Sequence, residues 1–213
     1  MQRQRSSPTR TDPVNGSESS TRGELLLRAL TAAGAVGVGG LLVGSLAGPA
    51  ASAPSPAQDV RILNYFLLLE YLQQGLYEEA RAAGGLNGEL NRFAAVAARQ
   101  EREHVASLRS ALGGDARSKP EFQFGEAIEN ERRFSAAAVT LEEAAAAAYI
   151  GQAANLTTKR IPMIARMVPV EARHAAWIRG IVGREPAPHA ADPAREPHEV
   201  EQTIERTGFV KRR

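Results

Sequence analysis

The chain has no cysteine among its 213 residues, and only 5% of its residues are aromatic. The absence of cysteine excludes disulfide bonds, cysteine-ligated zinc, iron–sulfur centres, a thiol nucleophile and a lipid anchor on cysteine. Few aromatic residues and much alanine favour closely packed helices over a β-sandwich. The apolar content of 43% is ample for the core of one domain. The composition therefore predicts an all-α domain of ordinary size.

The chain also lacks a strong excess of one charge, with 26 Lys and Arg against 24 Asp and Glu. Five arginines and three acidic residues fall within residues 1–53, so the rest of the chain is neutral. A domain that binds nucleic acid usually carries a basic patch, which would leave this part of the chain with positive net charge. We therefore expect no nucleic-acid partner.

Residues 1–53 have the features of a secretory signal peptide. A polar start with arginines precedes an uncharged, Gly/Ala-rich stretch at 29–47 and the tripeptide Ala-Ser-Ala at 51–53, which suits signal peptidase. We expect the export machinery to deliver the chain to the periplasm or the extracellular space, with cleavage after Ala53. The start resembles twin-arginine signals, although Arg22 stands alone where those have two arginines. The alternative is an uncleaved N-terminal membrane anchor, because the stretch is long enough to span a bilayer.

Apolar periodicity and glycine stops predict four long helices within residues 59–183. The second connection is the longest, as in a four-helix bundle with one crossover. Pro169 lies inside the fourth expected helix and should kink it or make it begin late. Residues 184–213 form a Pro-rich tail, with a short helix possible at 198–207. The four helices are expected from Asp59, as N-cap, to Gly84-Gly85, from about Gly88 to Leu112, from about Phe134 to Asn155, and from about Ile161 to Val182.

Two of the four histidines end the same kind of tetrapeptide, Glu101-Arg-Glu-His104 and Glu171-Ala-Arg-His174. Positions i and i+3 share one face of a helix, so each tetrapeptide directs a carboxylate and an imidazole to the same point. Such pairs also arise by chance, and alone they are only suggestive.

The first and third expected helices strengthen the pattern, because each has a Leu-Glu pair followed by a tyrosine. Glu70 precedes Tyr77 by seven residues, and Glu142 precedes Tyr149 by the same distance. The motif Leu-Glu-x6-Tyr followed by Glu-x-x-His thus occurs twice, which indicates a duplicated helical hairpin. Buried carboxylates are costly unless a cation compensates them, and four glutamates with two imidazoles suit two iron or two manganese ions. The metal-ligand candidates are Glu70, Glu101, His104, Glu142, Glu171 and His174, and Tyr77 and Tyr149 are candidates to orient them.

Four segments of the chain are similar to a known family. They are LNYFLLLEYLQQGLY, EREHVASLRSALG, LEEAAAAAYIGQA and VEARHAAWIRGIVG. Together they resemble the ferritin-like superfamily over residues 59–193, and within it the exported ferritin-like proteins grouped with plant desiccation-related proteins. The resemblance implies a ferritin-like bundle with the six candidates at the ligand positions. The chain departs from relatives at Gln73, where another glutamate is frequent, and at Pro169, where the helix of relatives usually runs unbroken.

The candidate ligands leave two classes of function open. A carboxylate-held iron or manganese pair that reacts with dioxygen or peroxide would make the protein an oxidoreductase, such as a ferroxidase or peroxidase. The alternative is a non-catalytic bundle that protects against stress or desiccation. Iron storage in a shell fits less well with export, and a homo-oligomer is possible. The remaining candidates are expected outside the site: Glu103 and Glu143 as solvated neighbours, Trp177 in packing, and His189 and His198 in solvent.

Overall fold

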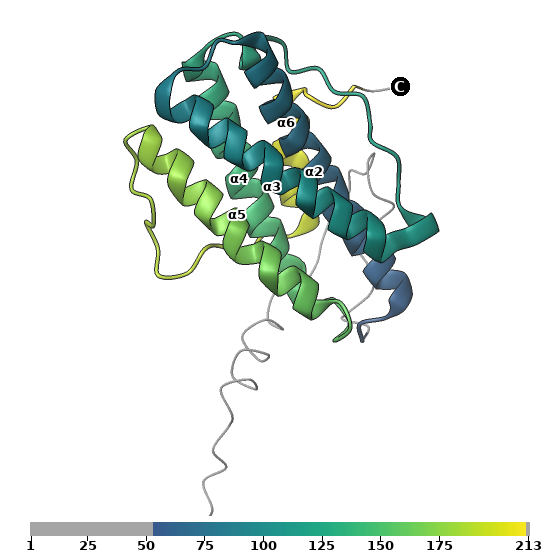
Figure 1. Cartoon of the computed structure of the whole chain (residues 1–213). Coiled ribbons are helices and arrows are strands. Elements are labelled where there is room, and N and C mark those ends of the chain that lie inside the picture. The colour runs from purple at the N-terminus through teal and green to yellow at the C-terminus, as the bar shows by residue number, and fades with distance from the viewer. Residues whose placement is uncertain (1–52, 212–213) are drawn as a thin grey trace, which may run out of the picture. The chain divides into compact units, whose positions relative to one another are not determined.

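The computed structural model describes residues 53–211. These residues form five α-helices, two short 3-10 helices and one isolated β-bridge (Figure 1). None of these helices is long and apolar enough to cross a membrane. The predicted signal peptide, residues 1–53, and the alternative anchor lie outside the described residues, apart from Ala53. The α-helices are α2 (Pro56–Ala83), α3 (Gly88–Leu112), α4 (Glu131–Ala153), α5 (Ile161–Ile181) and α6 (Pro197–Thr207).

Four of these helices pack as two hairpins. The short connection 84–87 joins α2 to α3, and residues 154–160 join α4 to α5. The hairpins meet through two further contacts, α2 with α4 and α3 with α5, and Figure 1 shows the four helices side by side. The long connection 113–130 links the hairpins and includes the 3-10 helices Gly113–Asp115 and Gly125–Ile128. This arrangement confirms the predicted all-α, ferritin-like bundle with one crossover.

The start of α2 differs from the prediction. Ser55 is the N-cap, its hydroxyl accepts a hydrogen bond from the backbone N–H of Gln58, and Pro56 occupies the first turn. Asp59 is therefore not the cap, and its buried side chain has another function. Its carboxylate accepts hydrogen bonds from the backbone N–H and the hydroxyl of Thr157, at 2.9 and 2.6 Å. Asp59 thus ties the start of α2 to the connection between α4 and α5.

The helix α3 spans the predicted residues Gly88–Leu112, and the boundaries of α4 and α5 differ from the prediction by at most three residues. The helix α4 begins at Glu131, because the side chain of Asn130 accepts a hydrogen bond from the N–H of Arg133 and caps it. The helix α5 begins at Ile161 and contains Pro169, so the late start is wrong, and a kink at Pro169 stays a prediction. Pro169 and Ala165 are both exposed, so the carbonyl that loses its usual donor lies where water can reach it.

The crossover and the C-terminal tail meet over α2. The ring of Phe124 is buried, and a Cβ atom on Gly75 would lie only 3.1 Å from it. Phe209 packs edge-on against Phe124 at 5.3 Å between ring centroids, and Phe122 forms an antiparallel bridge with Val210. The tail therefore holds the crossover against the bundle.

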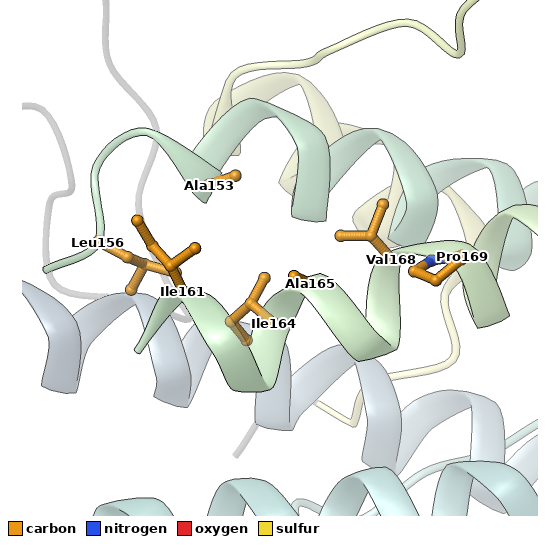
Figure 2. Close-up of a pocket in the computed structure, with 7 residues that line it drawn as sticks. All are labelled: Ala153, Leu156, Ile161, Ile164, Ala165, Val168 and Pro169. Carbon is orange, nitrogen blue, oxygen red and sulfur yellow. The ribbon is translucent and has the colours of Figure 1, made fainter. Parts of the chain in front are cut away.

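The helix α6 packs against α4 and buries Val200 and Ile204. A pocket of about 350 Å³ lies on another side of α4, between its C-terminal end and α5 (Figure 2). None of the six candidate ligands lines this pocket. The lining residues are Ala153, Leu156, Ile161, Ile164, Ala165, Val168 and Pro169.

Candidate metal centre

The six candidate ligands come together inside the bundle, although they lie up to 104 residues apart in sequence. Each of the four long helices contributes: α2 and α4 one glutamate each, and α3 and α5 one glutamate and one histidine each. The four glutamates are fully buried, and the exposed fractions of His104 and His174 are 8% and 2%. An acidic cluster this deep in a core is stable only if protons or cations compensate its charge.

The six side chains form two overlapping groups, each compact enough to hold one metal ion. In each group one nitrogen or oxygen atom per residue lies within 4.8 Å of those of the others. We call the first group, with Glu70, Glu101, His104 and Glu171, the Glu70–His104 position. We call the second group, with Glu101, Glu142, Glu171 and His174, the Glu142–His174 position. Glu101 and Glu171 belong to both groups, which is the arrangement expected of carboxylates that bridge two metal ions.

Both histidines direct Nδ1 at the carboxylates. Nδ1 of His104 lies 3.2 Å from Oε2 of Glu70, 3.0 Å from Oε2 of Glu101 and 3.0 Å from Oε1 of Glu171. Nδ1 of His174 lies 2.9 Å from Oε1 of Glu101 and 3.6 Å from Oε2 of Glu142. Nδ1 is therefore the ligand atom that each imidazole offers.

Four of the buried ligand atoms have no hydrogen-bond partner within residues 53–211. They are Oε1 of Glu101, Oε2 of Glu142, Oε1 of Glu171 and Nδ1 of His174. The contact of 2.9 Å between Glu101 and His174 thus brings two polar atoms together without the geometry of a hydrogen bond. A buried polar atom without a partner costs about 1–3 kcal/mol, and a cation would satisfy all four atoms at once. The residues therefore fit a metal ion.

Two tyrosines hold carboxylates across the bundle. The hydroxyl of Tyr77 on α2 donates a hydrogen bond to Oε1 of Glu142 on α4. The hydroxyl of Tyr149 on α4 donates in the same way to Oε1 of Glu70 on α2. Both tyrosines are fully buried, and their own burial together with the nearby carboxylates raises their pKa well above the usual value. They are therefore fixed donors, and each leaves the second oxygen of its glutamate free to face the centre.

The charges of the cluster shift the protonation equilibria of its members. Burial and the charge of Glu101 raise the pKa of Glu70 to about 7. Burial and the charges of Glu70 and Glu142 raise the pKa of Glu171 to about 7 as well. Burial lowers the pKa of His174, but Glu142 and Glu101 outweigh it and raise the pKa to about 11. Without a cation, carboxyl and imidazole groups of the cluster therefore still hold protons near neutral pH, where the same side chains in isolation would mostly have released them.

Two glutamines contact the cluster: Gln73, which the sequence marked only as a departure from relatives, and Gln100, which the sequence did not mark. Oε1 of Gln100, on α3, lies 2.6 Å from Nε2 of His174, on α5. Nε2 of Gln73, on α2, donates to Oε2 of Glu171 at 3.4 Å, and this glutamine is buried. Spacing within a single helix does not reveal the contact of Gln100, because its partner His174 lies on another helix.

The residues expected outside the cluster do lie outside it. Glu103 is exposed, and Glu143 accepts a hydrogen bond from Arg179 at 2.8 Å. His189 and His198 are exposed. Trp177 is half-buried, packs edge-on against Phe93, and donates its Nε1–H to Glu89 at 3.1 Å.

Comparison with known proteins agrees with this geometry. Residues 58–184, more than half of the chain, match the family described as a ferritin-like domain. A comparison with curated proteins gave no match. The match covers the four long helices, except the first two residues of α2, and every candidate ligand. It confirms the resemblance to the superfamily, while the exported, desiccation-related group stays a prediction. The chain therefore belongs to the ferritin-like family.

Proposed function

We propose that this protein is an exported oxidoreductase that holds two iron ions and uses them to react with dioxygen or peroxide. The observation that carries the proposal is the set of four buried ligand atoms without hydrogen-bond partners among the described residues. These atoms lie where the two shared carboxylates, Glu142 and the two histidines converge. Four glutamates and two imidazoles are donors suited to iron, and manganese is the alternative because the same donors suit it.

The protein's own contribution would be charge, geometry and exclusion of water. Glu101 and Glu171 would bridge the two ions, Glu70 and His104 would complete one position, and Glu142 and His174 would complete the other. Four carboxylates balance the charge of two divalent cations, so the loaded centre would be close to neutral within the core. Carboxylate-held ferrous ions supply electrons to dioxygen or peroxide.

The apolar residues around the ligands support the proposal that water is excluded from the metal centre. Phe66 stacks on Tyr149 at 4.1 Å between ring centroids, and Phe93 packs edge-on against Tyr77 at 5.5 Å. Both phenylalanines are fully buried. This shell keeps bulk water from competing with the carboxylates for metal, and it fixes the tyrosines that hold Glu70 and Glu142.

The test is anaerobic loading of the purified protein with Fe(II), followed by exposure to oxygen or to hydrogen peroxide. We expect two iron ions per chain, and we expect oxidant to be consumed as ferrous iron disappears in a ferrous-chelator assay. Glu101→Ala should lose the reaction, whereas Glu103→Ala, an exposed glutamate of the same helix, should keep it. The same loading with Mn(II) and peroxide tests the manganese alternative. Metal binding without oxidation would instead favour the non-catalytic, stress-protective bundle.

The proposed export rests on the sequence of residues 1–53. Cleavage after Ala53 would remove this segment, and the family match begins shortly after it, at residue 58. Intact mass of the protein recovered from the cell envelope or the medium tests the cleavage. A full-length chain in the cytoplasm would contradict export, and a full-length chain in the membrane would favour the anchor.

A further inference from the structure

The two metal positions are built from equivalent residues, but their histidines have different surroundings. Nε2 of His174 faces Oε1 of Gln100 at 2.6 Å, across the contact between α3 and α5. Nε2 of His104 forms no hydrogen bond with any residue in the described range 53–211, and this ring is the more exposed of the two. The protein therefore provides a hydrogen-bond partner for Nε2 of His174, and the described residues provide none for Nε2 of His104.

The duplicated motif shows where the difference comes from. Gln100 immediately precedes Glu101 in the first Glu-x-x-His tetrapeptide, and the corresponding residue of the second tetrapeptide is Val170. Valine has no side-chain hydrogen-bond acceptor, so Val170 cannot accept a hydrogen bond from Nε2–H of His104 as Gln100 accepts one from His174. The different surroundings of the two histidines thus follow from one pair of equivalent residues, Gln100 and Val170.

The same asymmetry appears among the ligand atoms. Nδ1 of His104 already forms hydrogen bonds with Glu70 and Glu101, at 3.2 and 3.0 Å. In contrast, Nδ1 of His174 and Oε2 of Glu142, which belong only to the Glu142–His174 position, have no hydrogen bond within the described residues. Of the two shared glutamates, Glu101 directs its unbonded Oε1 at His174, at 2.9 Å, and Glu171 directs its unbonded Oε1 at His104, at 3.0 Å. A metal ion at the Glu70–His104 position must therefore replace the hydrogen bonds of His104, whereas one at the Glu142–His174 position meets a histidine nitrogen that has none.

We propose that Gln100 is a positioning residue that makes the two metal positions unequal, so that the Glu142–His174 position binds its ion more tightly and fills first. The inference rests on the proposed metal centre. Gln100 accepts the hydrogen bond of Nε2–H, which fixes the His174 ring and leaves the lone pair of Nδ1 for the metal. Acceptors behind a ligand histidine typically change metal affinity about 10- to 100-fold.

The test measures Co(II) binding by equilibrium dialysis in variants that retain one position each. Glu70→Gln removes a ligand from the Glu70–His104 position, and Glu142→Gln removes one from the other. In the Glu70→Gln protein, adding Gln100→Leu should weaken Co(II) binding about 10- to 100-fold. In the Glu142→Gln protein, the same substitution should leave Co(II) binding unchanged. A purely structural effect of Gln100→Leu would weaken both.

Two further variants separate hydrogen bonding from packing. Gln100→Glu keeps an acceptor and should retain the affinity that Gln100→Leu loses. Val170→Gln adds the missing acceptor and should tighten the Glu70–His104 position, measured in the Glu142→Gln protein. Gln74→Leu removes a glutamine of α2 that donates to Glu78 outside the centre, and it should change neither affinity.

The outcomes distinguish this inference from the proposed function. If the unsubstituted protein binds no Co(II), the metal centre itself is refuted, and the role of Gln100 with it. If it binds two ions and Gln100→Leu leaves the affinity of the Glu70→Gln protein unchanged, only the role of Gln100 is refuted. Equal losses in both single-position proteins would also overturn it.

Discussion

Tyr77 on α2 donates its hydroxyl hydrogen to Glu142 on α4, a residue 65 positions further along the chain. The reciprocal bond runs from Tyr149 on α4 to Glu70 on α2. Each hairpin thus orients a carboxylate that belongs to the other. The position of these carboxylates depends on correct docking of the two hairpins, and not on either hairpin alone.

Removal of one of these hydroxyl groups should weaken metal binding without unfolding the bundle. Tyr77→Phe or Tyr149→Phe keeps the buried ring but frees the glutamate it held, so we expect about tenfold weaker Co(II) binding, measured by equilibrium dialysis. Tyr65→Phe is the matched control, because the buried hydroxyl of Tyr65 has no hydrogen-bond partner within the described residues. This control should leave metal affinity unchanged and keep or raise the free energy of unfolding.

The number of bound metal ions should depend on which glutamate is removed. Glu101 belongs to both metal positions, so Glu101→Ala should abolish stable binding of both ions. Glu70 belongs to one position, so Glu70→Ala should leave one ion per chain. Elemental analysis after dialysis measures both. Glu103→Ala and His198→Ala remove exposed residues and should leave two ions, and equal losses in all four variants would contradict the assignment.

The metal-free protein should lose stability as the pH rises. Burial and neighbouring charges raise the pKa of Glu70 and Glu171 to about 7, from an ordinary 4.5. Between these two values the unfolded chain releases protons that the folded chain retains, so stability falls with increasing pH in this window. Calorimetry of the metal-free protein should show a melting temperature several degrees lower at pH 7.5 than at pH 5.

Metal should reverse this loss, because it binds the deprotonated carboxylates of the folded state and releases their protons. Saturating Fe(II), kept anaerobic, or Mn(II) should therefore raise the melting temperature more at pH 7.5 than at pH 5. Glu70→Gln and Glu142→Gln together should raise the melting temperature of the metal-free protein at pH 7.5. A melting temperature that does not respond to metal would argue against a buried metal centre.

A methyl group at Gly151 should displace the C-terminal segment. A Cβ atom at this position of α4 would lie 2.2 Å from the carbonyl oxygen of Arg195, whose N–H donates to the carbonyl of Ala147 at 3.2 Å. Gly151→Ala should cost about 1–3 kcal/mol of unfolding free energy. Faster hydrogen exchange of the amides of α6 would locate the damage.

The control for this substitution is Gly180→Ala in α5. There the nearest atom to the added Cβ is Cγ of Pro186, at an ordinary 3.7 Å. Alanine has a higher helix propensity than glycine, so Gly180→Ala should leave the free energy of unfolding unchanged or raise it by about 0.5–1 kcal/mol. If Gly151→Ala and Gly180→Ala lowered the free energy of unfolding by similar amounts, the close approach of Arg195 to Gly151 would not be the cause of the loss.

Patterns within single helices predicted most of the architecture. Periodicity and glycine stops located the long helices, and the repeated motif singled out six side chains that the fold brings together. Features that depend on contacts between elements were not predictable in this way. The sequence predicted Asp59 as the N-cap of the first helix. In the structure Ser55 is the N-cap, and the carboxylate of Asp59 accepts a hydrogen bond from Thr157. Gln100 could have been noticed only as a mismatch between the two halves of the repeat.

The centre's division into two equal halves has a consequence for its origin. Each hairpin supplies two glutamates, one histidine and one tyrosine, and each needs the partner hairpin to complete the set. An ancestral hairpin that paired with its own copy would already have formed the whole centre, with identical halves. In such a pair every substitution would appear twice, so one half could not change alone. In the present chain Gln100 and Val170 are separate positions of one polypeptide, so the two halves can differ from each other, as they do at these two residues.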